Sequence, residues 1–93
     1  MRPVVSVRAR PAGRGWECTV EVEEGTTRSR HTVSVEPGDV ERWGRPGETA
    51  EGLVRRAFEF LLAREPASQI LRGFAVADIE RYFPEFDQEI RRP

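Results

Sequence analysis

The sequence predicts an α+β fold in one domain spanning residues 1–93, with a three-stranded antiparallel β-meander and helices packed on one face of it. Alternating apolar and polar residues fill the first third of the chain. A strongly apolar helical stretch follows, and an apolar stripe at helical spacing closes the chain. The expected strands are 3–10, 16–24 and 28–36, and the expected helices are 37–43, 49–64, 66–72 and 76–90, the last broken near Pro84.

The second and third strands form the best-defined hairpin. "WECTVEVE" and "RSRHTVSVE" both alternate, and a two-residue turn at Gly25-Thr26 places all their apolar residues on one face. A four-residue loop would keep the same parity. The other face sets opposite charges across from each other, each pair worth about 0.2–1 kcal/mol. The predicted pairs are Glu24–Thr27, Glu23–Arg28, Glu21–Arg30, Val20–His31, Cys18–Val33 and Trp16–Val35.

The first strand is expected over 3–10, with the sequence "PAGRG" turning the chain into the second strand. We expect Ala9 opposite Trp16 and Arg8 opposite Glu17. The meander then has one apolar face and one charged face, and the apolar face needs a cover.

The cover begins with a short helix that Pro37 opens, followed by a long helix over 49–64 with Thr49 as its N-cap. Apolar side chains occupy well over half the circumference of the long helix. Such a helix needs two packing partners, because a sheet covers only one side. Its polar arc consists of Arg55, Arg56 and Glu59.

The second partner of the long helix is the C-terminal stripe. We expect a short helical turn over 66–72, ended by Gly73, before the stripe begins. Pro84 interrupts the stripe and would cost about 3 kcal/mol inside a helix. Each buried Phe or Ile contributes about 1.5–3 kcal/mol, so we expect a restart with Pro84 at the first position of a last helix. The stripe consists of Val76, Ile79, Phe83, Phe86 and Ile90.

Composition excludes several kinds of chemistry. All fifteen basic residues are Arg, so neither a Schiff-base lysine nor a phosphate-binding lysine exists in this sequence. A net charge of −1 gives no general attraction to nucleic acid or anionic lipid. Cys18 is the only cysteine, and no stretch has the length of a membrane span. We therefore expect a cytoplasmic protein without membrane contact.

Two resemblances concern the second half of the chain. The run "RRAFEFLLAREPASQILRGF" followed by "IERYFPEF" resembles a family of small uncharacterised bacterial proteins, over residues 31–90, and implies no activity. Separately, "HTVSVEP" followed by a short and a long helix, over 31–64, is similar in order to ribbon-helix-helix regulators. That likeness implies a DNA-binding regulator or antitoxin in which Arg30, Thr32 and Ser34 would enter the major groove.

Catalytic and metal sites are not expected. Cys18 and His31 share the inner sheet face, but we interpret them as a small buried thiol and a satisfied histidine, since no third orienting residue is evident. One His and one Cys fall short of a zinc site, so we expect no metal and no cofactor. We therefore expect no enzymatic activity.

The candidate partner-binding residues lie on the outer sheet face and in the short helix. Arg8, Arg10, Arg28 and Arg30 share the outer face with glutamates that largely neutralise them. Trp43 is either an exposed aromatic anchor for a partner or a side chain that closes the core.

We predict a non-enzymatic protein-binding or regulatory module that binds a protein partner or a second copy. Strands 3–10 and 28–36 are the expected sheet edges and could pair with a copy, although arginines and prolines limit that pairing. The alternative is a ribbon-helix-helix-like regulator or antitoxin. Nucleic-acid binding is not favoured, because Glu48 and Glu51 would repel phosphate at the start of the long helix.

Overall fold

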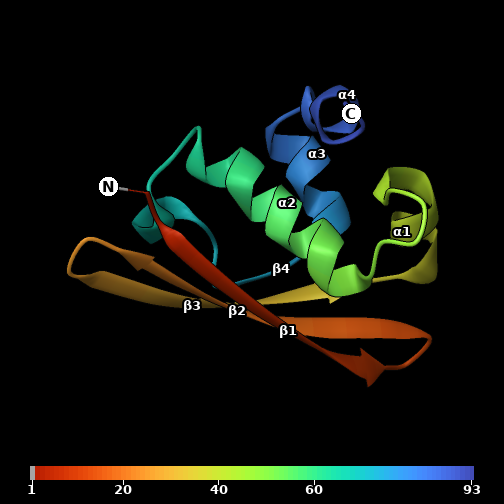
Figure 1. Cartoon of the computed structure of the whole chain (residues 1–93), viewed down its shortest axis with the longest axis horizontal. Coiled ribbons are helices and arrows are strands. Elements are labelled where there is room, and N and C mark those ends of the chain that lie inside the picture. Colours follow the sequence, from red (N-terminus) through yellow and green to blue (C-terminus); the bar gives the residue numbers. More distant parts are fainter. Residues whose placement is uncertain (1) are drawn as a thin grey trace.

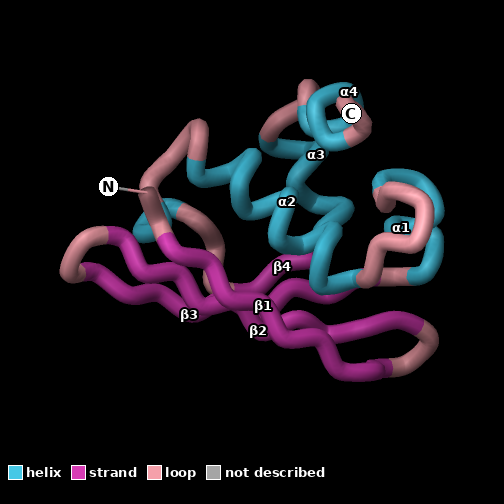
Figure 2. Tube along the Cα trace, viewed as in Figure 1, coloured by secondary structure: helices cyan, strands magenta, loops and turns pink. Residues whose placement is uncertain are grey.

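The computed structural model describes residues 2–93 and consists of one four-stranded sheet with helices on one of its faces (Figure 1). Figure 2 shows the helices on one side of the sheet and no helix, within the described residues, on the other. The α+β class and the three predicted strands are confirmed, and a short fourth strand joins them. In chain order the elements are β1 (Val4–Ala12), β2 (Gly15–Glu24), β3 (Thr27–Val35), α1 (Pro37–Trp43), α2 (Ala50–Leu62), η1 (Ala67–Gln69), β4 (Gly73–Ala75), η2 (Val76–Asp78), α3 (Ile79–Tyr82) and α4 (Phe86–Ile90).

The hairpin of β2 and β3 has the predicted register at every pair from Trp16–Val35 to Glu24–Thr27. A two-residue turn joins the strands, and Gly25 adopts the positive φ of 64° that such turns require. The alternation decides the register because a slip by one residue would expose the valines. Val20, Val22 and Val33 are accordingly buried on the helix-covered face.

The register between β1 and β2 was predicted wrongly by two residues. Ala9 lies opposite Cys18, and Arg10, in place of Arg8, lies opposite Glu17. The strand continues through Pro11 to a tight turn at Gly13, whose φ is 58°. Proline is tolerated there because β1 is an edge strand and Pro11 points its nitrogen to the open side. A shift of two residues keeps parity, so the predicted inner face is unchanged.

The fourth strand overturns two predictions. β4 runs parallel to β3 and pairs Gly73 with Thr32 and Ala75 with Ser34, so β3 (predicted over 28–36) is not an edge strand over this part. The predicted helix over 66–72 is reduced to the single turn η1. The chain leaves that turn in extended form, and the Arg72 carbonyl accepts a hydrogen bond from the Thr32 N–H at 2.7 Å. Sheet pairing therefore replaces helical bonds over the second half of this segment.

Side chains of α2 close the edge of β1. The Ala9 N–H donates to the Glu51 carboxylate at 2.8 Å, and the Val5 carbonyl accepts from the Arg55 guanidinium at 2.6 Å. Both backbone groups would otherwise be free to pair with a strand of another molecule. The edge predicted over 3–10 is confirmed as an edge, but two of its pairing positions are occupied from within the chain.

The long helix α2 is enclosed on both sides, as predicted. Thr49 is its N-cap, and its hydroxyl accepts from the Gly52 N–H at 3.2 Å. Figure 1 shows α2 between the sheet and the α3–α4 pair. Its buried residues are Ala50, Leu53, Val54, Ala57, Phe58, Phe60 and Leu61. The first helix, α1, also has its predicted bounds.

The predicted break near Pro84 is confirmed. Phe83 ends α3, and the Phe86 N–H donates to the Phe83 carbonyl at 2.9 Å in a turn that contains Pro84. Pro84 lies two residues before α4 rather than at its first position. Because the chain turns here, proline costs no interior helix bond. Phe86 and Ile90 can therefore both be buried against α2.

Candidate functional site: an apolar cleft beside β4

The four arginines predicted as partner-binding residues lie on the outer face of the sheet. Three of them pair with glutamates of β2, and Arg8 is the exception among the described ion pairs. These pairs are exposed, so each contributes little to stability. The face therefore carries alternating charges without an aromatic side chain on which a base could stack. The pairs are Arg10–Glu17, Arg28–Glu23 and Arg30–Glu21.

Trp43 is not an exposed anchor, because only 2% of its surface is accessible. Its indole N–H donates to Asp87 Oδ1 at 2.8 Å, and its ring meets the Phe86 ring edge-on at 5.3 Å. The hydrogen bond from Trp43 holds the pKa of the Asp87 carboxyl below its usual value. The indole therefore joins α1 to α4 and closes one end of the core.

His31 and Cys18 are both buried on the inner sheet face. His31 Nδ1 donates to the Leu71 carbonyl at 2.8 Å, since a carbonyl can only accept. In the neutral ring Nε2 then accepts from the Ser29 hydroxyl, also at 2.8 Å. Burial raises the pKa of the Cys18 thiol to about 11, with Glu51 adding to the effect. The histidine thus holds β3 to the segment before β4, and the thiol stays protonated at neutral pH.

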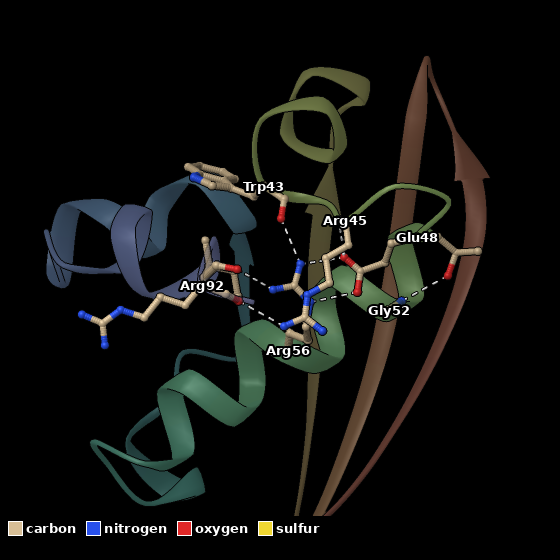
Figure 3. A network of polar contacts seen from close by, with 8 residues as sticks. Trp43, Arg45, Glu48, Gly52, Arg56 and Arg92 are labelled. Atoms are coloured by element: carbon tan, nitrogen blue, oxygen red, sulfur yellow. Dashed lines mark hydrogen bonds and ion pairs between the residues drawn. The ribbon is translucent and has the colours of Figure 1, made fainter.

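Arg56 lies at the centre of a polar network that connects three segments of the chain (Figure 3). Its guanidinium makes two hydrogen bonds to the Glu48 carboxylate, at 2.9 and 2.6 Å. It also donates to the carbonyls of Trp43 at 2.9 Å and Ile90 at 2.5 Å. The network therefore fixes the end of α1, the loop before α2 and the end of α4 to one another.

This role of Arg56 was not predicted. The sequence places Arg56 beside Arg55 on the polar arc of the long helix, yet the Arg56 side chain is only 14% exposed. The cause is the C-terminal segment, which covers Arg56 and accepts a hydrogen bond from it at the Ile90 carbonyl. Helical periodicity alone gave no signal for that cover. The Glu48 carboxylate points to Arg56, and this hydrogen bond is the main reason that the pKa of Glu48 lies below its usual value.

An apolar cleft of about 370 Å³ lies beside β4. Buried Leu61, Ile70 and Ile79 and half-buried Phe74 and Phe83 line it from α2, the segment before β4, β4 itself and α3. The volume falls in the range usual for ligand pockets. The remaining lining residues are Glu65, Gln69, Leu71, Asp78 and Tyr82.

Two of the cleft's aromatic rings rest on α2. The Phe74 ring lies 6.1 Å from that of Phe58, and the Phe83 ring meets the Phe60 ring nearly at right angles, with centroids 5.8 Å apart. Contacts of this kind hold both rings in place. The cleft is therefore preformed by the core rather than assembled from surface loops.

The cleft also presents large apolar side chains to solvent. Leu71 is 52% exposed and Tyr82 is 66% exposed. Val4, the other exposed large apolar residue in the described chain, lies apart on β1. Two exposed apolar side chains that line one apolar cleft are typical of a binding surface, whereas single ones are common on any protein.

The cleft was not predicted from the sequence. Tyr82 was the one residue that could have indicated it. Tyr82 is aromatic and lies outside the C-terminal apolar stripe, so it has no predicted packing partner. Leu71 gave no such signal, since its position was assigned to a helical turn that the chain does not form.

Within residues 2–93, no three side chains of His, Cys, Asp or Glu are grouped so that they could hold a metal ion. No helix in the described part is long and apolar enough to cross a membrane. Compared with known proteins, the chain matches no family model, no curated protein and no solved structure.

Proposed function

We propose that this protein is a non-enzymatic protein-binding module and that the apolar cleft beside β4 is its binding surface. The observation that carries the proposal is the exposure of Leu71 and Tyr82 above an apolar floor. Leaving two large apolar side chains in water costs free energy that a partner recovers on binding. Buried aromatic anchors in preformed pockets are also where interface energy concentrates.

The absence of catalysis is part of the proposal. Support comes from the two residues most able to react. Cys18 is fully buried with a raised pKa, which disfavours the thiolate needed for nucleophilic attack. His31 already uses both ring nitrogens in hydrogen bonds within the fold.

The sheet edges also support the proposal, because they are less open to a partner than the sequence predicts. In the ribbon-helix-helix alternative, the strand containing Arg30 and Thr32 pairs with its copy. Here that strand is β3, which has β2 on one side and β4 on part of the other. Glu51 and Arg55 also occupy the edge of β1. The cleft is therefore a more accessible surface than either sheet edge for a partner, including a second copy. We also propose that the protein is located in the cytoplasm.

A displayed library of random 16-residue peptides tests the proposal. Peptides selected on the wild-type chain are measured by fluorescence polarisation on a double variant, Leu71→Ser with Tyr82→Ser. The matched control is Val4→Ser, which removes an equally exposed apolar side chain elsewhere. Circular dichroism and thermal unfolding establish that all variants fold.

The proposal predicts at least a tenfold loss of affinity in the double variant, about 1.4 kcal/mol, and little change in the Val4 control. Equal affinity for all three proteins, or no selected peptide, would refute it. Analytical ultracentrifugation covers the case of self-association. A dimer that dissociates in the double variant but not in the control identifies a second copy as the occupant of the cleft.

A further inference from the structure

The cleft has a charge as well as an apolar floor. Two acidic residues, Glu65 and Asp78, line the cleft. No basic residue is among its described lining residues. Arg72 and Arg81 adjoin cleft residues in sequence but do not line it. Glu65 follows the C-terminus of α2, where the helix dipole adds negative potential. The cleft is therefore an apolar surface with an acidic rim.

Glu65 is unusual among the acidic residues of the described chain. It is half-buried, and no ion pair or hydrogen bond engages its carboxylate, whereas the other half-buried carboxylates have a partner. The neighbouring Arg64 does not serve it, because Arg64 pairs with Glu85 and Glu89. Asp78 receives one bond, from the Ala75 N–H at 3.0 Å to Oδ2, so Oδ1 has no partner among the described residues.

The sheet edge beside the cleft does not favour an extended partner. β4 has three residues, and the Ala75 N–H is already bonded to Asp78. Strand addition depends on a row of free backbone groups, whereas a helix binds a groove through side chains alone.

We infer that the cleft binds a basic amphipathic helix of a partner protein. This inference rests on the proposed function and names the partner's chemistry. Apolar side chains of the helix, spaced at i, i+3 or i+4 and i+7, contact Phe74, Phe83 and Tyr82. An Arg or Lys of the same helix pairs with Glu65, and a second basic residue reaches Asp78. Pairing a half-buried carboxylate gives this contact more specificity than an exposed ion pair has.

The experiment uses a displayed library of 16-residue amphipathic helices. Leu, Phe and Met vary at the apolar positions, and all residues are allowed at the flanking positions. Selection is run on the wild type, on Glu65→Gln and on Glu41→Gln, which neutralises an exposed carboxylate on α1 as a matched control. The best peptides are then titrated at 50 and 300 mM NaCl.

We expect Arg or Lys to be enriched at one flanking position on the wild type and on Glu41→Gln but not on Glu65→Gln. The affinity of the best peptide should fall about two- to fivefold on Glu65→Gln. Its salt dependence should weaken there as well, because one charge pair is gone. A proline placed at the centre of the peptide should abolish binding, since it breaks a helix.

Each of the other outcomes would refute a specific part of the inference or of the proposed function. Peptides that require Leu71 and Tyr82 but show no basic preference refute this inference and leave the proposed function standing. Peptides that tolerate the central proline refute the helical partner. Benzamidine is a small apolar cation that serves as a probe. If it changes the NMR chemical shifts of backbone amides in the cleft and no peptide is selected, the cleft is a small-molecule site. Selection of no peptide that depends on Leu71 and Tyr82 refutes inference and function together.

Discussion

Replacing Arg56 by Met should destabilise this protein far more than its position on a helix surface suggests. Methionine replaces the unbranched stem of arginine as far as the ε position but lacks the guanidinium. The change therefore removes four hydrogen bonds, two to Glu48 and one each to the carbonyls of Trp43 and Ile90, while the packing of the stem is kept.

The magnitude follows from burial. The side chains of Arg56 and Glu48 are 14% and 15% exposed, so the pair is nearly desolvated. Removing one partner of a buried pair costs about 3–5 kcal/mol. The remaining exposure lets water reach Glu48, so we expect the lower end, about 3 kcal/mol. For a domain of this size, that lowers Tm by about 12–24 °C.

The assay is urea unfolding of a double-mutant cycle formed by Arg56→Met, Glu48→Gln and both together. We expect a coupling of about 1–3 kcal/mol, because each single change leaves the other group without its partner. Arg81→Met is the control, since Arg81 is exposed and outside the described ion pairs. It should change stability by less than about 0.5 kcal/mol.

The pH dependence provides a second measurement. The folded pKa of Glu48 lies below its ordinary value of 4.5, chiefly because of the hydrogen bond from Arg56. The stabilisation is therefore present above about pH 4.5 and is lost as the pH falls through the folded pKa. The stability gap between wild type and Arg56→Met should narrow below pH 4.5. A variant within 1 kcal/mol of wild type at pH 7, or a cycle without coupling, would refute the role assigned to Arg56.

Three further predictions concern the core and the sheet edge. Cys18 should react with iodoacetamide only as fast as the chain unfolds, because its thiol is buried with a raised pKa; rapid labelling in native buffer would contradict this. His31→Leu should cost about 1–3 kcal/mol in urea unfolding by leaving the Leu71 carbonyl without its donor, and an unchanged midpoint would exclude that role. Replacing Glu51 and Arg55 by Ala should produce concentration-dependent association in light scattering, whereas a strictly monomeric variant would show that the edge needs no protection.

The parts of the fold that were predicted correctly depend on local patterns. The β2–β3 register follows from alternation and a glycine turn, and the enclosure of α2 follows from its apolar circumference. The break at Pro84 follows from the geometry of proline itself. In each of these cases the residues that decide the structure lie in one continuous segment of the chain.

The parts that were missed depend on contacts between distant segments. β4 has three residues, which is too short for any periodic signal, and it exists because β3 offers free backbone groups. Arg56 looks like a surface residue until the C-terminal segment covers it. The cleft was missed for the same reason, since its walls come from α2, β4 and α3, and only their packing brings Leu71 and Tyr82 together.

The parallel pairing of β4 has a consequence for the order of folding. Gly73 follows its partner Thr32 by about forty residues, whereas the hairpins close over turns of two residues. Long loops close at a higher entropic cost than short ones. The meander can therefore form before β4 pairs with the outer side of β3. A nascent chain shorter than about 75 residues lacks that neighbour, so the open edge of its β3 is available to chaperones and to strands of other molecules.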